Sequence, residues 1–284
     1  MLRSRLHDTR VTAPRQSMPM TMTPTKEFPR IAEILRGDPA SRPPSDRHTA
    51  AGLRANLEDA LYLVSHGRRR SSPLLISPQD LRATFTGVVR QQAPLGRLRG
   101  ILVAEILRLI AVGFVITDPY LDAVAAWMST RPHPESKLAF DQLEPDERAR
   151  LATDVTAHSV VLLQHFGHLQ STWNPRSSVS IIQHLGGGDV IVRDRIDLVV
   201  GSSSSLHSSV ALFDVITGPL DNSSELVLNY HALLETLRTG VVPLRVVALS
   251  TATGEVLRHD VTTSLLQQAA TLVSESIARK WSKP

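Results

Sequence analysis

Three acidic residues lie where a carboxylate can take part in chemistry. Asp197 and Asp214 each interrupt an apolar run of strand-like length, and Glu105 lies in an apolar segment with helical spacing. An aspartate within an apolar strand is costly to bury unless another group pairs with it. The two aspartates fall on successive predicted strands, so we expect them to meet at one edge of a sheet, with Glu105 arriving from a helix. Two or three such carboxylates hold Mg²⁺ or Mn²⁺ weakly, because Mg²⁺ keeps several of its waters. For Asp197 the alternative is a surface carboxylate at the end of a strand.

The elements that would hold these acids follow from the spacing of apolar residues. Residues 48–168 have the helical period, which predicts a series of amphipathic helices. After Pro175 the period becomes that of strands, and a glycine-rich segment over 186–189 predicts a hairpin turn. The expected order is three strands, a helix, a strand and a helix, over residues 179–184, 190–200, 209–216, 222–238, 243–250 and 262–280. This order predicts an α/β fold with a helical N-terminal part.

Composition divides the chain into two parts. Residues 1–47 are rich in Pro, Arg, Ser and Thr, which predicts a flexible tail. Residues 48–284 are expected to form a single domain, with a helical part over 48–170 and a sheet core over 175–284.

Bulk properties exclude several classes of protein. The chain has no cysteine, which excludes disulfides and an iron–sulfur cluster held by thiolates. No apolar run approaches the roughly 18 residues of a membrane helix, and residues 1–30 lack the pattern of a secretory signal. We therefore expect a cytoplasmic protein without membrane contact.

The net charge is +4 and is carried mainly by arginine. The basic segment Arg68, Arg69 and Arg70 is a candidate contact for nucleic-acid phosphates, with an ordinary solvated loop as the alternative.

Four segments carry a more specific pattern. They are Arg99–Glu105, Gly187–Gly201, Ala211–Gly218 and Leu226–Glu235. In that order they resemble the motifs G-x-x-[VI]-H-E, G-R-[IV]-D-L-[VI]-x-G, D-x-K-T-G and Q-x-x-x-Y of the PD-(D/E)XK nuclease superfamily, in its RecB-type exonuclease branch. The resemblance implies a PD-(D/E)XK-like core, in which helices flank a mixed central sheet. It also implies that Asp197 and Asp214 bind Mg²⁺ or Mn²⁺, and that Glu105 and Tyr230 occupy site positions.

The same segments depart from the family at three positions. Ala104 replaces a metal-binding histidine, Leu226 replaces a glutamine, and Ile216 replaces the lysine that helps to deprotonate the attacking water. Losing a preorganised electrostatic group of this kind lowers a rate by about 10²–10³. His231 and Arg238 are the candidates for a cation that has moved to another element, although each is also an ordinary residue of a surface helix. His158, His165 and His168 share one predicted helix face, without the spacing of a zinc helix.

Three functions follow, from different classes. The resemblance and the missing lysine favour a catalytically impaired protein that binds DNA, or acts as a scaffold beside a helicase or within a repair, recombination or defence complex. The first alternative is a weak or conditional Mg²⁺-dependent deoxyribonuclease that uses Glu105, Asp197 and Asp214. The second is a protein–protein interaction module in which these acids are structural. Whether the chain is an enzyme stays open at this point.

Overall fold

The computed structural model describes residues 31–35, 47–66, 71–87, 93–167, 169–202 and 208–282. Its helices are α1 (Ile31–Leu35), α2 (Arg47–Ser65), α3 (Pro78–Thr86), α4 (Pro94–Ala111), α5 (Pro119–Ser129), α6 (Pro134–Asp141), α7 (Pro145–Phe166), α8 (Asn222–Thr239) and α9 (Thr263–Trp281). Its strands are β1 (Leu74–Ile76), β2 (Arg176–Leu185), β3 (Val190–Val200), β4 (Ala211–Ile216), β5 (Arg245–Ser250) and β6 (Val256–Asp260). Most of the predicted tail, the segment Arg68–Arg70 and His168 lie outside the described residues.

Proline and short polar residues define where the helices begin. Each helix from α3 to α7 has proline in its first turn, where the missing N–H is not needed. The side chains of Asp118, Asp221 and Thr262 accept backbone N–H groups at the starts of α5, α8 and α9. Glycines with positive φ, Gly186, Gly187 and Gly188, form the turn that joins β2 to β3. The predicted hairpin is thus confirmed.

The described strands form one mixed, six-stranded sheet. In the order β1, β3, β4, β5 and β6, the first and third pairings are parallel and the other two are antiparallel. The mixed α/β architecture expected from the sequence is confirmed, with a helical N-terminal region from α2 to α7.

Strand β3 is the centre of the sheet because three strands pair with it. Strand β2 runs antiparallel along nearly all of it, from Arg176 opposite Val199 to Leu185 opposite Val190. A strand has only two edges, so β1 and β4 must share the other one: β1 pairs with residues 190–192 and β4 with residues 198–200. Between these ladders, residues 193–197 have no described strand partner on that edge. We call this opening the fork.

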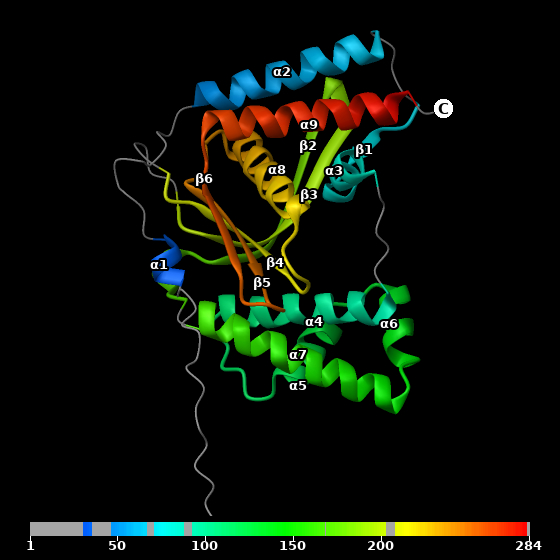
Figure 1. Cartoon of the computed structure of the whole chain (residues 1–284), viewed down its shortest axis with the longest axis vertical. Helices are drawn as coiled ribbons and strands as arrows, with labels where there is room; N and C mark the ends of the chain where they lie inside the picture. The colour runs from blue at the N-terminus through cyan, green and yellow to red at the C-terminus, as the bar shows by residue number, and fades with distance from the viewer. Residues whose placement is uncertain are drawn as a thin grey trace, which may run out of the picture.

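Two apolar layers cover the faces of the sheet. Helices α2, α3, α8 and α9 enclose one core with Ile76, Val192 and Leu212, and helices α4, α5 and α7 enclose the other with Leu198 and Phe213. Figure 1 shows α2, α8 and α9 on one side of the sheet and α4, α5 and α7 on the other. Alternation along β4 separates the two layers, because successive side chains point to opposite faces. None of the described helices is long and apolar enough to cross a membrane.

Three elements were not predicted from the sequence. Strand β6 has only five residues and follows a turn. Strand β1 has three residues between serine- and proline-rich turns, too few to display a period. Helix α6 has eight residues and buries only Ser136 and Phe140. Because β1 joins the sheet and α2 packs with α9, the segment before residue 170 contributes elements to both layers.

Candidate functional site: a polar pocket at the fork of the sheet

A pocket with a volume of about 390 Å³ opens at the fork. Elements from both halves of the chain line it, because β1 leads directly into α3 while β4 leads into α8. The lining residues are Ser77, Pro78, Gln79 and Arg82 beside or on α3, Ser180 and Ile182 on β2, Arg193, Asp194 and Arg195 on β3, Asp214 on β4, and Val227 and His231 on α8. Charged side chains predominate on β3, where the strand lacks a neighbour.

The structure brings Asp197 and Asp214 together at this point. The ladder between β3 and β4 ends with Leu198 opposite Phe213, so the two aspartates follow at the position where the strands separate. The backbone N–H of Val215 donates to Asp197 Oδ2 at 2.8 Å. Burial, and then the charge of Asp214, raise the pKa of Asp197 from 3.8 to about 7, although the Val215 N–H, His231 and Arg195 oppose the shift.

His231 lies in the same pocket as an ion pair with Asp194. Its Nε2 is 2.6 Å from Asp194 Oδ2, and the histidine side chain is 2% exposed. Burial opposes a charge on this ring. The hydrogen bond and charge of Asp194, helped by Asp214 and Asp197, outweigh burial and raise the pKa of His231. The Nδ1 atom is also buried and has no hydrogen-bond partner among the described residues.

Three arginines of the pocket are not ion-paired with any described acidic residue. They are Arg82 on α3 and Arg193 and Arg195 on β3. The Nε of Arg82 is buried without a hydrogen-bond partner in the described part of the chain. These three arginines and Asp194 were missed in the sequence. The alternation Arg193-Asp194-Arg195 within an apolar strand was the signal that pointed to them.

Tyr230 has a structural position. It is 1% exposed, and its hydroxyl lies 3.2 Å from the carbonyl oxygens of Ile76 and Arg193, to which it can donate. Burial and the charge of Asp194 raise its pKa far above the ordinary value. The tyrosine therefore joins β1 to β3 beside the fork, with its ring in the core.

Glu105 lies apart from the two aspartates. It is on α4, which packs against the sheet face of Leu198 and Phe213, whereas Asp214 lines the pocket with residues of α3 and α8. Its carboxylate accepts a hydrogen bond from Arg108 Nε at 2.6 Å. The structure gives Glu105 an arginine partner one turn further along its own helix.

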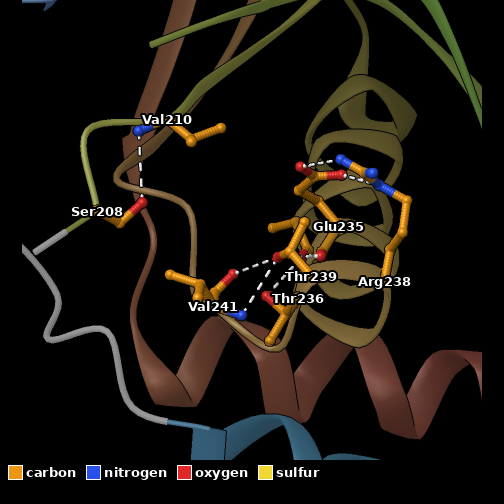
Figure 2. Close-up of polar contacts among 8 residues, drawn as sticks. Ser208, Val210, Glu235, Thr236, Arg238, Thr239 and Val241 are labelled. Carbon is orange, nitrogen blue, oxygen red and sulfur yellow. Dashed lines mark hydrogen bonds and ion pairs between the residues drawn. The ribbon is translucent and has the colours of Figure 1, made fainter. Parts of the chain in front are cut away.

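Arg238, the other candidate for a displaced cation, is engaged elsewhere. Figure 2 shows its guanidinium group facing Glu235, with Nε 2.8 Å from Oε2 and Nη2 2.7 Å from Oε1. The pair lies in the last turns of α8, and Thr239 Oγ1 donates to the Glu235 carbonyl beside it. Seven residues separate Arg238 from His231, about 10 Å along a helix. Of the two candidates, only His231 lines the pocket.

The metal implied by the family resemblance does not fit these residues well. Among the described residues, no set of three or more His, Asp or Glu side chains is arranged to hold a metal ion. Asp214 lines the pocket, Asp197 accepts the Val215 N–H, and Glu105 is paired with Arg108. An Mg²⁺ site prefers several oxygen ligands with octahedral geometry. The lining of this pocket contains more arginine and histidine side chains than carboxylates.

The histidines of α7 belong to the other layer. His158 is buried and forms a hydrogen bond with the backbone of Thr251. Burial lowers its pKa, as expected for a neutral core histidine.

Comparison with known proteins yields distant structural similarity only. The chain is similar to the crystal structure of SSO0001, with a TM-score of 0.32 and 11% sequence identity, over 78% of this chain and 84% of that one. No family model matches the sequence, and no curated protein matches it.

Proposed function

We propose that this chain is a DNA-binding relative of the RecB-type nucleases, impaired in hydrolysis, whose pocket at the fork holds a backbone phosphate. One observation carries the proposal: Arg82, Arg193 and Arg195 line one pocket, and none of them is ion-paired with a described acid. A guanidinium group offers N–H donors in a fixed planar arrangement that matches phosphate oxygens. Such contacts position a nucleic acid without reading its sequence.

The charge of the pocket also favours an anion. Asp194 and His231 largely neutralise one another through their ion pair. The other charged side chains of the lining are then three arginines against the single carboxylate of Asp214. A concave site with excess positive charge attracts polyanions and speeds their association.

Impaired hydrolysis is proposed because the group that would assist the nucleophile is absent. Ile216 stands at the lysine position of the D-x-K-T-G motif, and its side chain packs partly against the core. An aliphatic side chain neither accepts a proton from water nor offsets charge on a phosphate. We propose accordingly that DNA is bound more readily than it is cleaved, as suits a component of a repair, recombination or defence complex.

Salt-dependent DNA binding tests this proposal. Fluorescence anisotropy with labelled single- and double-stranded DNA would compare the wild type with Arg82→Ala, Arg193→Ala and Arg195→Ala. Each substitution should weaken binding several-fold and lower the slope of log K against log salt by about one. The matched control is Arg150→Ala, an exposed arginine on α7 in the other layer, which should leave both quantities unchanged.

The same samples separate the alternatives. Cleavage in Mg²⁺ or Mn²⁺ that is lost in Asp197→Ala and Asp214→Ala would favour a conditional nuclease, the function to which the proximity of these two acids points. If neither DNA form binds in a salt-sensitive way, the proposal fails, and a protein partner becomes the subject of the search.

A further inference from the structure

We infer that the pocket binds phosphate directly, without a bridging divalent cation, and that the Nδ1–H of His231 is one of its donors. The inference rests on the proposed function, because it concerns how the same pocket would hold the DNA backbone. It adds the Asp194–His231 pair to the binding site, and it specifies a phosphate mono- or diester as the ligand chemistry.

The first argument is a buried donor that lacks an acceptor. His231 Nε2 faces Asp194 at 2.6 Å, which leaves Nδ1 as the free side of the ring. That atom is buried and has no partner among the described residues, although the ring lines the pocket. A buried donor without an acceptor is unfavourable, so a ligand oxygen that accepts from it gains the full value of the hydrogen bond.

The second argument is a matching donor that comes from another element. Arg82 comes from α3, and its buried Nε likewise lacks a described partner. Arg193 and Arg195 complete a ring of donors around the fork. Donors from α3, β3 and α8 thus line one space, whereas a cation there would meet three arginines.

The third argument is that the part of the pocket formed by α3 is held in place before any ligand arrives. Asp80 Oδ2 accepts both the backbone N–H and the hydroxyl of Ser77, which fixes the start of α3. Lys280 on α9 then pairs with Asp80 Oδ1 at 2.7 Å and donates to the Leu75 carbonyl. A second core helix therefore clamps the segment that carries Arg82. Donors that are positioned in advance lose little entropy when a phosphate binds.

The substitution Asp214→Asn distinguishes direct from metal-mediated binding, because the two modes predict opposite changes in affinity. If the phosphate contacts the arginines and His231 directly, the carboxylate of Asp214 repels it. Asp214→Asn should then bind a labelled oligonucleotide several-fold more tightly in EDTA, and adding Mg²⁺ should not raise the affinity of the wild type. If a cation bridges the phosphate and the Asp214 carboxylate, Asp214→Asn should weaken binding and abolish a Mg²⁺ dependence that the wild type shows.

A paired substitution tests the role of His231. Asp194→Asn combined with His231→Gln keeps both side chains neutral and of similar size, so that no buried charge is left alone. This variant should lose about tenfold in affinity, as expected when a charged donor to phosphate is removed. Inorganic phosphate should also compete less well against the oligonucleotide in this variant than in the wild type. The control His158→Gln, on a buried histidine of the other layer, should keep wild-type binding.

The outcomes distinguish this inference from the proposed function. Binding that requires Mg²⁺, or that weakens in Asp214→Asn, overturns the direct phosphate site while DNA binding itself stands. Unchanged affinity in the folded double variant, with folding checked by circular dichroism, overturns the role of His231. The absence of any salt-sensitive DNA binding by the wild type overturns the proposed function instead.

Discussion

His231 on α8 and Asp194 on β3 form an ion pair across the fork, with 2.6 Å between Nε2 and Oδ2. The aspartate lies on the part of β3 that neither β1 nor β4 reaches, so this pair supplies a connection where the ladder is interrupted. Both side chains are well buried, 2% and 13% exposed. This ion pair stabilises the packing of α8 against β3 only while both side chains are charged.

The stability that this pair contributes should depend on pH. Because the folded-state pKa of His231 is raised, the contribution is fully present below the unfolded pKa of 6.5 and is lost as the pH rises through the folded value. Asp194→Asn should therefore reduce the free energy of unfolding by about 3 kcal/mol in mildly acidic buffer, and by less in alkaline buffer. Urea unfolding at several pH values measures this. Asp141→Asn, in an exposed pair with Lys137, is the control and should change little at any pH.

The sequence predicted the fold better than it predicted the site. Periodicity located β2, β3 and β4, and the Asp197–Asp214 approach followed from their order. The part of the pocket contributed by α3 was not foreseen, because β1 is three residues long and Arg82 is 111 residues from Arg193 along the chain. The alternative that His231 is an ordinary residue of a surface helix is wrong, because His231 is 1% exposed and α8 is buried along most of its length. Its role depends on Asp194, which no helical or strand period connects to it.

Asp197 should make the folded protein less stable as the pH rises. Its pKa is raised from 3.8 to about 7, so the folded state binds more protons than the unfolded state between these values. Stability from this group is then full below pH 3.8, falls through the window from 3.8 to 7, and stays reduced above it. Asp197→Asn should be near neutral in acidic buffer and stabilising by about 1–3 kcal/mol in alkaline buffer. Equal effects at both pH values would show that Asp197 is not in a buried, acidic environment.

Tyr230→Phe should loosen the connection between β1 and β3. The substitution keeps the buried ring but removes the hydroxyl that faces the Ile76 and Arg193 carbonyls. We expect a loss of about 1–2 kcal/mol in the free energy of unfolding, because a buried acceptor is left unpaired. Hydrogen exchange should also become faster in β1, whose only strand partner in the described chain is β3. Tyr62→Phe, on a side chain that is 68% exposed, should change neither.

Arg238 should matter for stability and not for DNA binding. Glu235 is 2% exposed and has both carboxylate oxygens on the Arg238 guanidinium group, so Arg238→Met leaves a buried charge without its partner. We expect a loss of about 3 kcal/mol, as for other broken buried pairs, and recovery of most of it in the double variant Glu235→Gln/Arg238→Met. Oligonucleotide affinity of both variants should equal that of the wild type, because Arg238 does not line the pocket. A loss of affinity in Arg238→Met that the double variant does not restore would instead make Arg238 the displaced cation, and would remove that role from His231.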